Sequence, residues 1–154
     1  MTEVIPTEKV TEAIRKIVAE SPHFLYRGHS GGRYGYADDE GNPSCLVGCV
    51  LAEVAPDLLA RLHEGEKRTG ESTSFTTSTL KILGVYELPF EARTIRALCR
   101  AQAAQDTGYS WGMALDRYLV ELKQKVGAEN HPTHTARRRH DDRTNRPRGR
   151  SDGV

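Results

Sequence analysis

The residues most suggestive of catalysis form the glycine-rich run 28–32, which reads Gly-His-Ser-Gly-Gly and matches the G-x-S-x-G pattern of serine hydrolases. In those enzymes the serine lies on a strained turn between a strand and a helix, and its Asp and His partners follow later in the chain. Here residues 33–38 favour a strand and a turn, and 154 residues are too few for the usual hydrolase sheet. We therefore interpret residues 28–32 as a hairpin loop and expect no catalytic residue there.

Two of the three cysteines, Cys45 and Cys49, are spaced so that a helix would bring both thiols to one side. With His23 or His29 they could bind a soft metal ion such as zinc. Both lie beside an apolar stripe, however, and buried free cysteines pack as small apolar side chains, which is also our interpretation of Cys99. A metal-binding or enzymatic site around Cys45, Cys49 and His29 remains the alternative.

Two further groups of potential metal ligands lack either the spacing or the scaffold that a metal site needs. The acidic turn 38–40 is followed by Gly41 but lacks the alternating oxygen ligands of a calcium loop. His131, His134 and His140 lie in a segment that we expect to have no fold to fix their geometry. We therefore predict no bound metal and no cofactor.

Charge is unevenly distributed along the chain. The net charge is +1, yet residues 131–154 contain seven arginines and three aspartates, which leaves residues 1–130 with a net charge of −3. Because this end of the chain has almost no aliphatic residues to bury, we expect residues 128–154, the basic tail, to be disordered. Mobile guanidinium groups neutralise phosphates, so the tail is a candidate nucleic-acid contact, with a merely solubilising role as the alternative. The arginines concerned are Arg137, Arg138, Arg139, Arg143, Arg146, Arg148 and Arg150.

A group of polar and aromatic residues is the candidate contact for a partner protein. Gln102, Gln105 and Asp106 end one expected helix, and Trp111 begins the next, which is typical of a structural junction but also of a ligand-stacking corner. Two tyrosines, two positions apart, would project from one face of a strand. The candidate partner-binding residues are Tyr34, Tyr36, Gln102, Gln105, Asp106 and Trp111.

Apolar periodicity predicts the elements that position these residues. A first helix is expected from Thr7 as its N-cap to the stop at Ser21-Pro22, because its apolar residues recur at three-and-four spacing. Residues 24–26 and 33–36, which are short and aromatic, predict the two strands of a β-hairpin. The apolar residues of the first helix that form one stripe are Val10, Ala13, Ile14, Ile17 and Val18.

The rest of the chain favours helices joined by turns. Asn42 as N-cap and Pro43 as first residue predict a central buried helix that Pro56 breaks, with its apolar face at Leu46, Val47, Val50, Leu51 and Val54. We expect a short helix over 57–63, a mobile loop over 64–74 and a short helix over 79–83 that Gly84 closes. Pro89 would open a longer helix ending at 106–108, and Ser110 would cap a last one. Its expected stripe is Trp111, Leu115, Tyr118, Leu119 and Leu122.

These elements define the predicted class and location. The fold class is mainly α, a compact domain of five to six helices with one short β-hairpin near the N-terminus, spanning residues 1–127 before the basic tail. No apolar run approaches a membrane span, and the start of the chain does not read as a signal peptide. With an odd number of cysteines, these features favour a cytoplasmic protein that does not contact membranes.

Two strings give a resemblance to a known group of proteins. Residues 36–48, YADDEGNPSCLVG, and 101–115, AQAAQDTGYSWGMAL, resemble the two signatures of small uncharacterised proteins of actinobacteria and their phages, over residues 5–125. The resemblance implies a phage or prophage accessory protein in the host cytoplasm and transfers no catalytic residue. We therefore expect a non-enzymatic protein that binds a host macromolecule. The alternatives are a small nucleic-acid-binding protein that uses its tail, and the cysteine site above.

Overall fold

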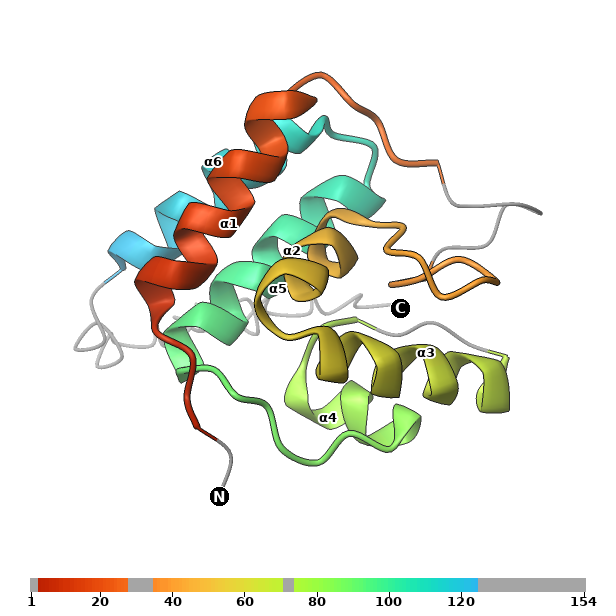
Figure 1. Cartoon of the computed structure of the whole chain (residues 1–154). Helices are drawn as coiled ribbons and strands as arrows, with labels where there is room; N and C mark the ends of the chain where they lie inside the picture. The colour runs from red at the N-terminus through yellow and green to blue at the C-terminus, as the bar shows by residue number, and fades with distance from the viewer. Residues whose placement is uncertain (1–2, 28–34, 71–73, 125–154) are drawn as a thin grey trace, which may run out of the picture. The chain divides into compact units, whose positions relative to one another are not determined.

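The computed structural model describes residues 3–27, 35–70 and 74–124. The chain divides into two units, Met1–Lys123 and Gln124–Val154, and the first contains all the helices of the described residues. Its fold is mainly helical, as predicted, and the described residues form isolated β-bridges but no longer strand (Figure 1). The elements are α1 (Thr7–Glu20), α2 (Leu46–Val54), α3 (Pro56–Thr69), α4 (Thr77–Leu80), the 3₁₀ helix η1 (Lys81–Leu83), α5 (Ala92–Asp106) and α6 (Trp111–Lys123).

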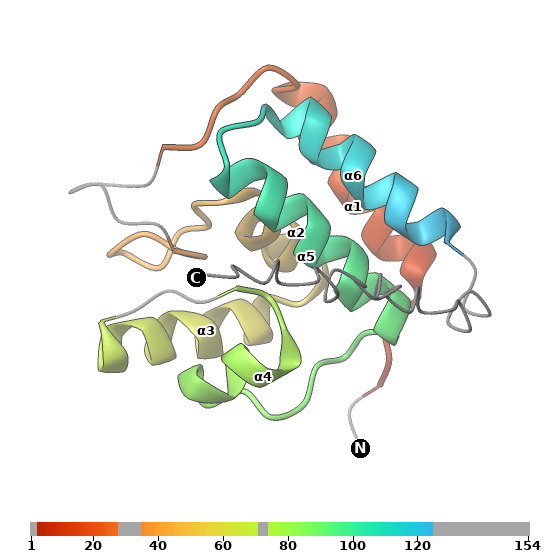
Figure 2. The ribbon, with the colours of Figure 1, turned by 180° about the vertical axis from the view of Figure 1, so that it is seen from behind.

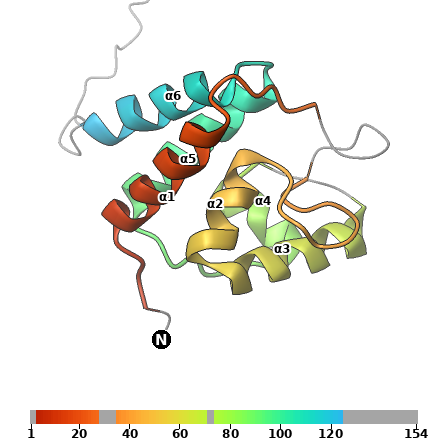
Figure 3. The same ribbon diagram turned by 45° about the horizontal axis from the view of Figure 1, so that its top comes forward.

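The short helix α2 is the centre of this unit, because it packs against α1, α3 and α5. Helices α5 and α6 form an antiparallel pair, and α1 lies beside α6 on the same side of α2 (Figure 2). Helix α3 packs on the other side of α2 (Figure 3). The 3₁₀ helix η1 packs against α3, and α4 packs against η1. Among the described residues, no helix combines the length and apolar character that crossing a bilayer requires.

The apolar stripe of α1 is confirmed, but its N-terminal cap is not. Val10 and Ile14 are fully buried in the stripe. Pro6, not Thr7, holds the N-cap position, and its carbonyl accepts the backbone N–H of Lys9 at 3.0 Å. The Thr7 hydroxyl is instead hydrogen-bonded to the buried Thr94 hydroxyl of α5 at 2.7 Å. The hydroxyl that would cap α1 is therefore used in a tertiary contact.

The expected β-hairpin is not seen in the described residues, and its loop and Tyr34 lie outside them. The Tyr26 side chain replaces a strand ladder, because its hydroxyl accepts the Gly35 N–H at 3.3 Å and is hydrogen-bonded to the Ser44 hydroxyl at 2.9 Å. The antiparallel bridge forms later in the chain, between Ala37 and Pro43.

That bridge explains why α2 begins at Leu46 and not at Pro43 as predicted. The backbone before Leu46 is engaged in the turn: the Asn42 carbonyl accepts the Asp38 N–H at 2.8 Å, and the Ser44 N–H binds the Tyr36 carbonyl at 2.9 Å. Cys45 takes the N-cap position that Asn42 was expected to hold. The predicted apolar face is otherwise confirmed, with Leu46, Val47, Val50 and Leu51 fully buried and Val54 only partly so.

The prediction of a loop over 64–74 is wrong for residues 64–69, because α3 continues to Thr69 and ends at Gly70 in the left-handed region with φ 73°. The buried stripe of α3 extends through Gly65, which lies against Leu83 of η1. An added Cβ at Gly65 would lie 2.3 Å from the Leu83 carbonyl oxygen. A glycine that packs by backbone contact gives no apolar signal in the sequence, and the helix was therefore predicted too short.

Three later boundaries test the remaining predictions. Gly84 closes η1 in the left-handed region with φ 84°, as expected. Helix α5 begins at Ala92 and not at Pro89, since the Pro89 carbonyl accepts the Ile5 N–H at 2.7 Å in a parallel bridge. Ser110 caps α6 as predicted, and its hydroxyl accepts the Met113 N–H at 3.3 Å.

Candidate functional site

Gln105, near the end of α5, joins three helices at one buried point. Its Oε1 accepts the backbone N–H of Leu46 at the start of α2 at 2.7 Å and the indole N–H of Trp111 at the start of α6 at 3.0 Å. Its Nε2 donates to the Asp106 carboxylate at 2.9 Å. All the polar atoms of this buried amide are therefore used within the protein, as burial of a polar group requires.

Gln102, one helical turn earlier, makes a second buried junction. Its Oε1 accepts the Phe75 backbone N–H at 2.7 Å and the Tyr36 hydroxyl at 3.3 Å. The aromatic rings of Tyr36 and Phe75 pack edge to face, with centroids 6.1 Å apart. The two glutamines thus fasten the segments around residues 36, 46 and 75 to α5.

The structure separates the predicted partner-binding residues into three groups. Those that it buries, with internal hydrogen bonds, are Tyr36, Gln102, Gln105 and Trp111. Asp106 is exposed, and Tyr34 lies outside the described residues. Buried and satisfied side chains give a partner nothing to touch unless the protein opens locally, so the geometry favours the structural-junction interpretation for Gln102, Gln105 and Trp111.

Four exposed apolar side chains belong to the two segments that meet at this junction. We define the corner surface as Phe24, Leu25, Tyr109 and Met113, whose exposed fractions lie between 40% and 45%. These four are half of the eight large apolar side chains that the described ranges leave exposed, and the other four are Val4, Ile82, Tyr86 and Val120. Figure 1 shows the segment after α1 lying against the start of α6, where all four originate. The two segments that carry them are joined by backbone hydrogen bonds.

Backbone and ring contacts hold the corner surface in place. The Phe24 carbonyl accepts the Trp111 N–H at 3.0 Å, and the two rings pack with centroids 4.6 Å apart. The Pro22 carbonyl accepts the Gly112 N–H at 2.8 Å, so the segment after α1 satisfies the free N–H groups at the start of α6. The Arg117 guanidinium lies 6.0 Å from the centre of the Tyr109 ring. The surface is therefore preorganised.

The cysteines carry no activated thiol among the described residues. Burial raises the pKa of the Cys45 thiol far above its ordinary value, and its sulfur accepts the Gly48 N–H at 3.3 Å as the cap of α2. Burial also raises the pKa of Cys49 to about 11 and raises that of Cys99. A thiol must ionise to act as a nucleophile or metal ligand, and these pKa values keep all three protonated at neutral pH.

The alternative metal site around Cys45, Cys49 and His29 is only partly described, because His29 lies outside the described ranges together with Ser30. Within those ranges, no three His, Cys, Asp or Glu side chains are grouped as metal ligands. The tail arginines also lie outside them. The corner surface is consequently the candidate site that the described geometry supports.

Comparison with known proteins adds no assignment, since the chain matches no protein-family model, no curated protein and no solved structure. The resemblance to actinobacterial and actinophage proteins therefore stays a prediction. The case for a function depends on the chain's own geometry.

The exposed side chains at this corner are not the ones that the sequence pattern singled out. Trp111 was expected to contact a partner, whereas Tyr109 and Met113 are the exposed residues beside it. Met113 does carry a signal, because it is apolar yet lies outside the stripe that begins at Trp111. Phe24 and Leu25 were assigned to a strand, and that assignment concealed their exposure.

Proposed function

We propose that this protein is a non-enzymatic phage or prophage accessory protein that binds a host protein through the corner surface. The observation that carries the proposal is that four of the exposed large apolar side chains belong to two segments that meet at one buried junction. Aromatic residues, Met and Arg are enriched at protein interfaces, and Phe24, Tyr109, Met113 and Arg117 supply all three kinds here.

Energetic considerations favour the corner surface as the centre of such an interface. Partly exposed aromatic side chains lose their remaining contact with water when a partner covers them, at about 25 cal/mol per Å². Residues that dominate binding lie near the centre of an interface that buries about 800 Å² on each side. Because Phe24 is already packed on Trp111, little side-chain entropy remains to be lost there on binding.

Affinity capture from an actinobacterial lysate, with nuclease added, tests the proposal. We compare the wild-type chain with a Tyr109→Ser, Met113→Ser variant and with a matched control, Ile82→Ser, Tyr86→Ser. The control residues are at least as exposed, at 53% and 71%, but belong to the segment around η1. The same host protein should be captured by the wild type and the control and lost from the corner variant. Equal capture by all three chains contradicts the proposal.

A small nucleic-acid-binding protein is the second candidate, and the seven arginines of residues 131–154 favour it. Cations that neutralise phosphates release counterions, so the affinity for DNA or RNA should fall steeply as salt is raised. Deletion of residues 131–154 separates the two functions. The first is supported if salt-sensitive nucleic-acid binding disappears while capture of the host protein survives; the second is supported if both disappear.

A further inference from the structure

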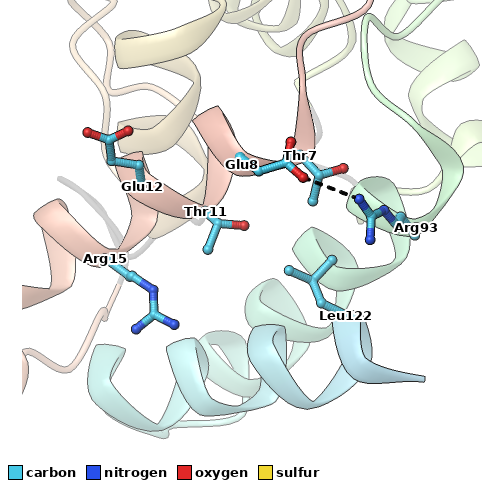
Figure 4. A pocket seen from close by; sticks show the side chains of 7 residues that line it. All are labelled: Thr7, Glu8, Thr11, Glu12, Arg15, Arg93 and Leu122. Carbon is cyan, nitrogen blue, oxygen red and sulfur yellow. Dashed lines mark ion pairs between the residues drawn. The ribbon is translucent and has the colours of Figure 1, made fainter. Parts of the chain in front are cut away.

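A hollow of about 400 Å³ opens between the first half of α1, the start of α5 and the end of α6. Thr11 and Leu122 lie in its middle, with the guanidinium groups of Arg15 and Arg93 on either side (Figure 4). It lies at the opposite end of the α1 and α6 pair from Phe24, and its use would be independent of the corner surface. It is open to solvent, so a ligand bound there would stay partly exposed.

The two guanidinium groups are in different electrostatic states. Arg93 is paired with Glu8 at 3.6 Å and with Glu91 at 3.2 Å. Arg15 forms no ion pair within 4.0 Å in the part of the chain that the structure describes. Figure 4 shows the Glu12 carboxylate directed away from Leu122, so it does not compensate Arg15 inside the hollow. An anion entering there would find Arg15 available.

The Thr11 hydroxyl lines the hollow and is backed by the buried Tyr118. The Thr11 hydroxyl is hydrogen-bonded to the Tyr118 hydroxyl at 2.9 Å. Burial raises the pKa of Tyr118, whereas Arg93 and Arg15 both act to lower it and Glu8 acts to raise it. When the Tyr118 hydroxyl donates to Thr11, the Thr11 hydroxyl keeps its own hydrogen to donate to an acid oxygen in the hollow.

From this geometry we propose that the hollow binds a small organic carboxylate. Its acid group pairs with the guanidinium of Arg15 and accepts a hydrogen bond from the Thr11 hydroxyl, and its short aliphatic body lies on Leu122. A guanidinium matches a carboxylate with two parallel hydrogen bonds, which gives the site its preference for that group over a neutral one. Arg93, which is paired with Glu8 and Glu91, forms the opposite wall and makes no direct bond to the ligand, so Arg15 alone supplies the charge that attracts it.

Titration of the full-length, ¹⁵N-labelled chain with hexanoate, followed by NMR, tests this proposal, with hexan-1-ol as the neutral probe of equal chain length. Hexanoate should shift the amide signals of Thr11 and Leu122 saturably. Arg15→Gln should weaken this binding by about tenfold or more, because it removes the charge-assisted pair. The control is Arg61→Gln, on the exposed surface of α3, which should bind hexanoate as the wild type does.

Three results would overturn the proposal. The first is a shift that does not saturate, which indicates nonspecific contact. The second is equal affinity for hexan-1-ol and hexanoate, which leaves no role for the acid group. The third is unchanged binding by Arg15→Gln in a protein whose thermal unfolding matches the wild type.

Discussion

Glu66 is a half-buried carboxylate that fastens the chain around Tyr36 to α3. Its Oε1 accepts the Tyr36 N–H at 2.8 Å, and the Ala37 N–H also binds the carboxylate. Burial raises the pKa of Glu66 from 4.5 to about 7, because desolvation outweighs these two hydrogen bonds. Between pH 4.5 and about 7, the folded protein therefore keeps a proton on Glu66 that the unfolded chain has lost.

A pH-dependent stability follows for this residue. Between pH 4.5 and about 7 the folded state binds more protons than the unfolded state, so the free energy of unfolding falls as pH rises through this window. Glu66→Gln should remove this pH dependence. The stability of the variant minus that of the wild type should therefore be about 1 to 2 kcal/mol greater at pH 8 than at pH 5. This difference is smaller than the free energy that corresponds to the whole pKa shift, because Glu66 is partly in solvent. Urea unfolding at both pH values measures it. If the exposed control Glu64→Gln behaves in the same way, Glu66 is not the cause.

Gln105 offers a second prediction at the scale of one side chain. Gln105→Leu removes the acceptor for two buried N–H groups, those of Leu46 and Trp111. Each donor left without a partner costs about 1 to 3 kcal/mol, so we expect a loss of about 2 to 4 kcal/mol in the free energy of unfolding. Chemical denaturation measures this loss. A change below about 0.5 kcal/mol would mean that water or another group satisfies both donors.

At the scale of elements, two helices approach neighbouring backbone through glycine. Gly48 of α2 lies against Tyr36, and an added Cβ would lie 2.0 Å from the Tyr36 carbonyl oxygen. The corresponding distance from Gly65 of α3 to the Leu83 carbonyl oxygen is 2.3 Å. Both neighbours are main-chain atoms, which cannot move aside as a flexible side chain can.

Alanine at either glycine should therefore reverse the usual order of helix propensity. Gly→Ala inside a helix normally stabilises by about 1 kcal/mol. Here we expect Gly48→Ala and Gly65→Ala each to destabilise by about 2 kcal/mol or more, because α2 or α3 must shift away from its neighbour. Thermal and urea unfolding give the sign directly. A gain in stability from either substitution would show that the helix has room for the added methyl group.

For the domain as a whole, the reactivity of the three cysteine thiols measures whether the protein unfolds as one cooperative unit or through local openings. Cys45 is 3% exposed in the core that α1, α2, α5 and α6 share, whereas Cys49 and Cys99 are only partly buried. Alkylation of the native protein at pH 8, read by peptide mass spectrometry, should modify Cys45 only at the rate of global unfolding. Cys49 and Cys99 should react faster, through local openings. Modification of Cys45 as fast as Cys99 would contradict a single closed core.

The sequence alone predicted those elements whose signals lie within one or two helical turns. The stripe of α1, the apolar face of α2, the glycine that ends η1 and the Ser110 cap depend on residues close together in the chain, and all four were correctly predicted. It also indicated the junction between α5 and α6, because Gln102, Gln105 and Asp106 end one expected helix and Trp111 begins the next. Short-range spacing is sufficient for such features, since helix periodicity and capping are local.

Only the tertiary structure determined which side chains at that corner are buried. Gln105, a predicted partner-binding residue, accepts the backbone N–H of Leu46, 59 positions away in the sequence. Its amide thus joins α5 to α2 inside the protein. The contact of Gly65 with Leu83 likewise extends α3, and the Tyr26 bonds to Gly35 and Ser44 take the place of the expected hairpin. The physical reason is that burial and hydrogen bonding depend on contacts between segments that are distant in the chain. A pattern of neighbouring residues carries no information about such contacts.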